Sequence, residues 1–206
     1  MLRIGLPALS LVALTACDPV ALIEKAGTVD EPEISCATRP ERGCVYDQAP
    51  LRVLPEPVVI PTRAYKFFPT ATSLTFVDSR GREWVAPRRT LTDGASIPPI
   101  FVSIVGDPTS PEFINAAAVH DAYCGVGNET GANFHNGRWE DVHIMFYDGL
   151  VAGGTDKSRA QLMFAAVWLG GPRWRTSRDL THVPAARMQL SMRQTQNYIA
   201  TNNPTL

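Results

Sequence analysis

The sequence lacks several features that would place it in a familiar class. No charge of one sign is in excess, because 19 Lys and Arg residues face 20 Asp and Glu residues, for a formal net charge of −1. Nucleic-acid binding usually needs a clustered basic face, so we expect no nucleic-acid partner. Hydrophobic residues make up 45% of the chain and charged residues 19%, which is typical of a globular protein. The 206 residues suffice for one domain and a tail.

Common catalytic motifs are also missing. There is no G-x-S-x-G elbow, which argues against serine hydrolysis, and no H-E-x-x-H helix. No histidine precedes His120, whereas an HD-type metal phosphohydrolase needs one well upstream. Zinc ligand types are present in His120, Asp121, Asp141 and His143, so zinc chemistry stays as a rival interpretation.

The N-terminal apolar run at residues 4–13 is too short to span a bilayer. It follows Arg3 and precedes LTAC at 14–17, which resembles the bacterial lipoprotein box. That resemblance implies a lipid-modified Cys17, hence a bacterial lipoprotein anchored in membrane lipid and facing the periplasm. Asp18 resembles an inner-membrane retention signal. A plain secretion signal with an incidental cysteine is the alternative.

We predict three parts of the chain: a signal peptide at 1–17, a tether at 18–55 rich in Pro, Glu, Asp and Thr, and one globular domain at 56–206. In an oxidising periplasm we expect Cys36 and Cys44 to form a small disulfide. The remaining Cys124 is then expected to be a buried, unreactive side chain.

The expected fold is α+β, with a small N-terminal β-hairpin element followed by a mainly helical core. Two β-prone runs flank a turn at 78–81 and predict a hairpin over 73–87, and YKFF at 65–68 predicts a short strand. Capping, proline and glycine signals predict helices at about 110–123, 138–151, 155–170 and 185–200. The first two of these helices are expected to pack antiparallel.

The stretch AAAVHDAYCG at 116–125 places His120 beside Asp121 in an apolar run. Burying either group without a partner is costly. We predict that antiparallel packing brings Asp141 to His120, where a carboxylate would hold the imidazole in one tautomer and leave its other nitrogen as a base. A purely structural His-Asp pair is the alternative.

Asp121 then needs another role. The loop TDGASIP at 92–98 contains Gly94, which permits backbone conformations that aim carbonyl oxygens inward. A carboxylate next to such a loop suits a hard cation such as calcium.

The loop, the His-Asp helix and the later aspartate together resemble secreted phospholipase A₂ of the prokaryotic and fungal branch, which has a similar histidine-to-aspartate spacing. The resemblance implies that the helical core with its two antiparallel helices is phospholipase A₂-like. It also implies that His120 activates a water, that Asp141 orients His120, and that Asp121 binds calcium with the carbonyls of Asp93 and Gly94. Cys124 departs from this pattern, which has a tyrosine there.

A second resemblance covers about residues 60–180 and is closer. It is to an uncharacterised, phage-associated family of unknown function with a TDGASIP loop at 92–98, a His-Asp helix at 116–121 and a Gly-x-x-Trp at 171–174. It implies no established activity.

The sequence therefore predicts a lipoprotein that hydrolyses phospholipid esters, with calcium as the expected cofactor and phospholipid as the substrate. The alternative is a non-enzymatic, phage-derived lipoprotein with a structural or superinfection-exclusion role. We expect Asp148, His135 and His143 to be surface residues.

Overall fold

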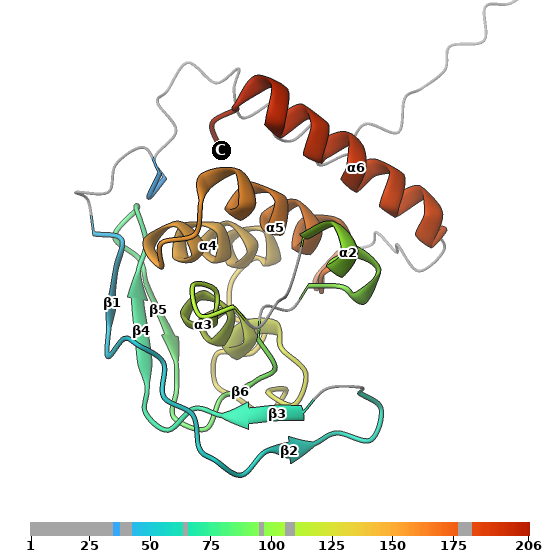
Figure 1. Ribbon diagram of the computed structural model, residues 1–206. Coiled ribbons are helices and arrows are strands. Elements are labelled where there is room, and N and C mark those ends of the chain that lie inside the picture. Colours follow the sequence, from blue (N-terminus) through green and yellow to red (C-terminus); the bar gives the residue numbers. More distant parts are fainter. Residues whose placement is uncertain (1–34, 38–42, 64–65, 95–96, 106–109, 177–182) are drawn as a thin grey trace, which may run out of the picture.

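The structure is a computed structural model that describes residues 35–37, 43–63, 66–94, 97–105, 110–176 and 183–206. The predicted signal peptide, Cys17 and Asp18 lie outside these residues. The described residues form a mixed α+β fold (Figure 1). Its elements are β1 (Val45–Asp47), β2 (Val58–Val59), β3 (Lys66–Pro69), β4 (Leu74–Val77), β5 (Glu83–Ala86), β6 (Leu91–Thr92), the 3₁₀ helix η3 (Pro99–Phe101), α2 (Val102–Val105), α3 (Ile114–Cys124), α4 (Trp139–Ala152), α5 (Lys157–Gly170) and α6 (Ala185–Asn202).

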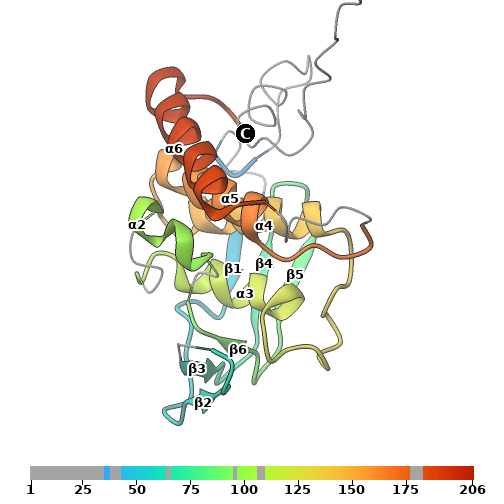
Figure 2. The ribbon, with the colours of Figure 1, turned by 90° about the vertical axis from the view of Figure 1, so that its right-hand side faces the viewer.

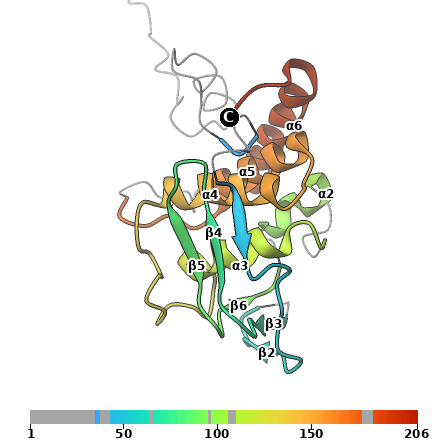
Figure 3. The same cartoon turned by 90° about the vertical axis from the view of Figure 1, so that its left-hand side faces the viewer.

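Six short strands form two three-stranded antiparallel sheets, with orders β1-β4-β5 and β2-β3-β6. The predicted hairpin is confirmed, since β4 pairs with β5 and sets Phe76 opposite Trp84. The predicted strand at 65–68 corresponds to β3. In Figures 1, 2 and 3 the sheet of β2 and β3 lies at the end of the molecule opposite α6.

Strand β1 lies inside the segment that the sequence assigned to the tether, so the folded part begins before residue 56. Tyr46 of this strand stacks on Phe76, with ring centroids 4.7 Å apart. A three-residue strand is too short to show an alternating pattern of apolar and polar residues. Contacts with distant residues therefore determine that this segment forms a strand. The nearby Cys36 and Cys44 are joined by a disulfide.

Two buried carboxylates organise the turn between β4 and β5. Asp78 accepts hydrogen bonds from the indole N–H of Trp84, at 2.8 Å, and from the backbone N–H of Arg82.

The prediction that Asp148 lies on the surface is wrong. It is buried on α4, where it accepts hydrogen bonds from the Ser79 hydroxyl and the Cys36 backbone N–H. These donors offset much of the cost of burying its charge.

The four long helices lie where the sequence predicts them. Residues 110–113 form a turn, so that α3 begins at Ile114, later than expected. The carboxylate of Asp156 caps α5 by accepting from the backbone N–H groups of Ser158 and Arg159. None of the helices in the described ranges is long and apolar enough to cross a membrane.

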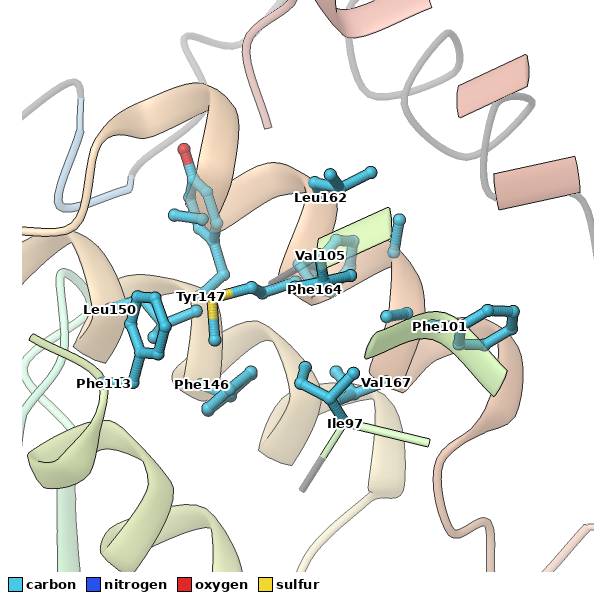
Figure 4. Close-up of a cluster of buried hydrophobic side chains, with 14 of the residues drawn as sticks. Ile97, Phe101, Val105, Phe113, Phe146, Tyr147, Leu150, Leu162, Phe164 and Val167 are labelled. Atoms are coloured by element: carbon cyan, nitrogen blue, oxygen red, sulfur yellow. The ribbon is translucent and has the colours of Figure 1, made fainter. Parts of the chain in front are cut away.

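The main core fills the space between α3, α4, α5 and the η3–α2 segment (Figure 4). Its largest fully buried side chains include Phe101, Phe113, Phe146, Tyr147 and Phe164. Apolar side chains of this size contribute roughly 1.5–3 kcal/mol each on burial. This core holds α3 and α4 together and so positions the residues of the candidate site.

Ala116 of α3 lies against Gly149 of α4. His120 meets His143 further along the same seam, so the two helices run antiparallel, as predicted. A Cβ on Gly149 would lie 2.6 Å from the hydroxyl oxygen of Tyr46 and 3.2 Å from the Ala116 Cβ. The Tyr46 hydroxyl also donates a hydrogen bond to the Gly149 carbonyl, at 2.8 Å.

We therefore expect Gly149→Ala to lower the free energy of unfolding by about 1–3 kcal/mol, because the added methyl overpacks this seam. Tyr46→Phe alone should cost about 1 kcal/mol for the lost hydrogen bond. The double variant should cost less than the sum, because phenylalanine lacks the oxygen that the methyl meets. Urea unfolding of the four proteins tests this, and strictly additive costs would contradict the proposed contact.

Candidate functional site

A cavity of about 550 Å³ opens beside the C-terminal end of α3. Two carboxylates line it, Asp93 from the loop after β6 and Asp121 from α3. Apolar side chains supply much of the remaining wall. Thr62 and Arg63, from the segment between β2 and β3, are polar residues that also line it. The lining residues also include Phe67, Ile97, Pro98, Pro99, Cys124, Val126 and Pro172. Its volume lies within the range of small-molecule sites.

Strand β6, which leads into this loop, is held against the end of α3 by the Asn128 side chain. Its amide oxygen accepts from the Leu91 backbone N–H at 2.8 Å, and its amide nitrogen donates to the carbonyls of Leu91 and Asp121 at 2.9 and 3.0 Å. Gly94 has a φ of +101°, a conformation that a residue with a Cβ rarely adopts. These two features place Asp93 and Asp121 on the same cavity.

The pKa of the Asp93 carboxyl is raised from its usual value, chiefly because the group is partly buried. The positive charge of Arg63 acts in the opposite direction. Partial burial beside a largely apolar cavity therefore favours the protonated form of this carboxyl more than solvent exposure would.

The structure does not bring His120 to Asp141. The fully buried imidazole of His120 instead places its Nε2 3.0 Å from Nδ1 of His143, which is fully buried as well. One of these two nitrogens donates the hydrogen of this bond and the other accepts it. The prediction that His143 is a surface residue is therefore wrong.

Helix geometry explains why Asp141 is absent from this pair. His143 occupies the seam between α3 and α4, and a residue two positions earlier lies about 200° around the helix. Asp141 consequently faces away from His120, and its carboxylate pairs with the Arg82 guanidinium at 3.2 Å. The predicted catalytic pair of His120 and Asp141 is thus not formed.

Burial keeps both seam histidines neutral. It lowers the pKa of His120 to about 3 and lowers the pKa of His143 well below its usual value. The neighbouring His120 and Arg173 lower the pKa of His143 further, while the backbone carbonyl of Pro172 opposes them. A neutral imidazole without solvent contact has no path to a water molecule, so this pair is suited to holding the helices together.

Cys124 is buried, as predicted, but also lines the cavity. Its Sγ lies 3.4 Å from Nε2 of His120. Burial, and then the negative charge of Asp121, raise the pKa of the thiol well above its usual value. The thiol form therefore prevails at neutral pH, which makes Cys124 a weak nucleophile.

The sequence pattern gave a wrong environment for His143 and no indication of the role of Asn128. His143 lies two residues after Asp141 on an apolar stripe that includes Phe146 and Leu150, and this periodicity could have indicated its burial. Asn128 carried no usable signal, because a turn asparagine usually bonds its own neighbourhood. His135 is half-buried, with its ring stacked on Trp174.

The donor set of the cavity is suited to a hard cation. Asp93 and Asp121 offer carboxylate oxygens, and calcium is bound by six to eight oxygen ligands from carboxylates, backbone carbonyls and waters. Among the residues that the structure describes, no group of three His, Cys, Asp or Glu side chains converges as a metal site. A cation here would therefore also need backbone carbonyls and water.

Residues 69–167 match the family model described as "Protein of unknown function (DUF1353)", so a domain of that description is found in this part of the chain. The chain is also similar to two proteins of Sinorhizobium fredii, each named as uncharacterized. It is 41% identical to y4iH over 99 residues, which are 48% of this chain and 38% of that protein. It is 35% identical to y4jT over 107 residues, which are 52% of this chain and 30% of that protein. No solved structure matches significantly.

The buried histidine pair predicts that stability falls in mild acid. Both pKa values are lower in the folded state, so the unfolded chain binds more protons once the pH falls below about 6.5. Each histidine should cost up to about 1.4 kcal/mol per pH unit from there downward. In urea unfolding between pH 7 and pH 5, His143→Gln should give a shallower dependence on pH. His135→Gln should change the slope less, because His135 is only half-buried, although burial and the charge of Arg175 lower its pKa as well. Equal slopes in all three proteins would contradict this account.

Proposed function

We propose that this chain is a membrane-anchored lipoprotein that hydrolyses phospholipid esters in the cavity beside α3. The observation that carries the proposal is that Asp93 and Asp121, 28 positions apart in the sequence, line one open and largely apolar cavity. The phospholipase-like interpretation of the sequence needed this meeting of loop and helix.

The working groups differ from those that the sequence suggested. His120 is buried and bonded to His143, so it is not the base in this proposal. Asp121 and carbonyls of the loop around Gly94 would hold a calcium ion, which would supply Lewis-acid polarisation of the ester carbonyl. Asp93 would act as the acid–base group, because its carboxyl lines the same cavity as Asp121.

The apolar cavity wall suits the lipid portion of such a substrate. Phe67, Ile97 and Val126 offer surface for the carbon atoms next to the ester, and Arg63 offers a positive charge for a phosphate. An anchor at Cys17 would keep the cavity close to lipid and raise the local substrate concentration without added affinity.

A non-enzymatic, structural or superinfection-exclusion role is the second candidate. It is favoured by the complete burial of His120, because a structural role in packing is then enough to explain a histidine in this helix. The two candidates differ in whether the cavity carboxylates are needed for any chemistry.

Fatty-acid release from mixed phospholipid micelles distinguishes them. We expect calcium-dependent release by the full chain, and a decrease of about 100-fold or more in Asp93→Asn and in Asp121→Asn. Asp141→Asn is the matched control and should stay within about twofold of the wild type, because Asp141 lies outside the cavity.

Absence of release from the wild-type chain would favour the non-enzymatic role. Loss of activity in Asp141→Asn, with Asp121→Asn active, would instead restore the pair of His120 and Asp141. Calcium binding is measured separately by calorimetry, where Asp121→Asn should abolish the heat and Asp141→Asn should not.

The anchor has its own test. In a Gram-negative host grown with labelled palmitate, the wild-type chain should incorporate label and sediment with membranes, because acylation of Cys17 supplies buried methylene groups. Cys17→Ser should incorporate none, while Cys124→Ser should label like the wild type. Label that persists in Cys17→Ser would exclude the proposed lipoprotein box.

A further inference from the structure

The end of the molecule formed by β2 and β3 exposes apolar side chains. Val53, Val58 and Val59 have 38, 38 and 66% of their surface exposed. Figures 1, 2 and 3 all place this end opposite α6. The β2–β3 tip is defined here by the exposed residues Val53, Val58, Val59, Arg52, Arg63 and Lys66.

The tip is held in a defined shape. The Arg52 carbonyl accepts from the Ala71 backbone N–H, and the Leu54 backbone N–H donates to Pro69, so this segment is tied to the start of the next loop and to β3. β2 pairs with β3, with Val58 opposite Phe67 and Val59 opposite Lys66. The valines are therefore exposed on an ordered edge.

Strand β2 is poorly suited to pairing with a strand of another protein. It has two residues and lies at the edge of its sheet. Pro57 precedes it directly and Pro61 follows one residue after Ile60, and proline cannot donate to a β-ladder. The prolines protect the strand edge while the valine side chains stay exposed.

The charges of the tip favour an anionic partner. Arg52, Arg63 and Lys66 are exposed, and Glu56 is the acid within the same stretch of described residues. Basic side chains beside exposed apolar ones are suited to a membrane surface, where each Lys or Arg adds about 1 kcal/mol of attraction to anionic lipid. A stable protein interface would need roughly 800 Å² from each partner, far more than three valines offer.

We propose that the β2–β3 tip inserts Val58 and Val59 into the surface of an anionic bilayer, with Arg52, Arg63 and Lys66 on the lipid headgroups. This contact is additional to the anchor at Cys17. It precedes the segment that matches the family model and depends on neither calcium nor hydrolysis.

The proposed membrane contact would also position the cavity relative to the lipid. Directly opposed residues of an antiparallel pair share a face of the sheet, and successive residues alternate between the faces. Val58 therefore lies on the face of Phe67, and Val59 lies with Lys66 on the other face. Phe67, Thr62 and Arg63 line the cavity. Because Arg63 belongs to both the tip and the cavity wall, a tip seated on the bilayer through the edge strand β2 brings the cavity close to lipid. This consequence, unlike the binding itself, rests on the proposed function.

Cosedimentation with vesicles tests the proposal on the full-length Cys17→Ser chain, which lacks the acyl anchor, in EDTA. Vesicles of phosphatidylcholine and phosphatidylglycerol should bind the protein, and pure phosphatidylcholine should bind it much less. Val58→Asp/Val59→Asp should lower the partition coefficient at least tenfold. Arg63→Gln and Lys66→Gln should each lower it about fivefold.

Leu190→Asp is the matched control, because Leu190 is 56% exposed on α6 at the opposite end. It should bind like the parent chain, and circular dichroism should be the same for all variants. Unchanged binding by the double valine variant, equal loss in Leu190→Asp, or no binding of the parent chain would each overturn the proposal. The double valine variant should still hydrolyse micellar substrate. A failure of the proposed membrane contact can therefore be told apart from a failure of the proposed hydrolytic function.

Discussion

The seam between α3 and α4 is the constraint on which the rest of the structure depends. Two imidazoles meet there without solvent, and their shared hydrogen bond satisfies one nitrogen on each ring. Along the same seam the absence of a side chain at Gly149 lets the helices approach. A change in this packing would move the end of α3, and with it Asp121.

The seam also separates two roles that the sequence suggested were one. Within HDAYC at 120–124, His120 turns to the neighbouring helix, whereas Asp121 and Cys124 line the cavity. The histidine therefore contributes to stability and the aspartate to the cavity. The pairing of His120 with Asp141, which the resemblance to phospholipase A₂ implied, is not formed, because the two side chains face different ways.

Much of the fold could be predicted from local signals. The turn at 78–81, the Asp156 cap and the glycines after the helices each specify an element through neighbouring residues. Strand β1 and the buried Asp148 could not, because their partners lie in distant segments. For the candidate site, the sequence indicated that the loop at 92–98 and Asp121 belong together, and it gave the wrong partner for His120.

The sequence by itself determined where the helices and the hairpin lie, because caps, turns and periodicity act over a few residues. It also determined which groups are costly to bury. Only the tertiary structure decided how that cost is met: His143 rather than Asp141 faces His120, since two positions along a helix reverse the direction of a side chain. Which residues share a cavity was likewise decided by packing between segments that are distant in the chain.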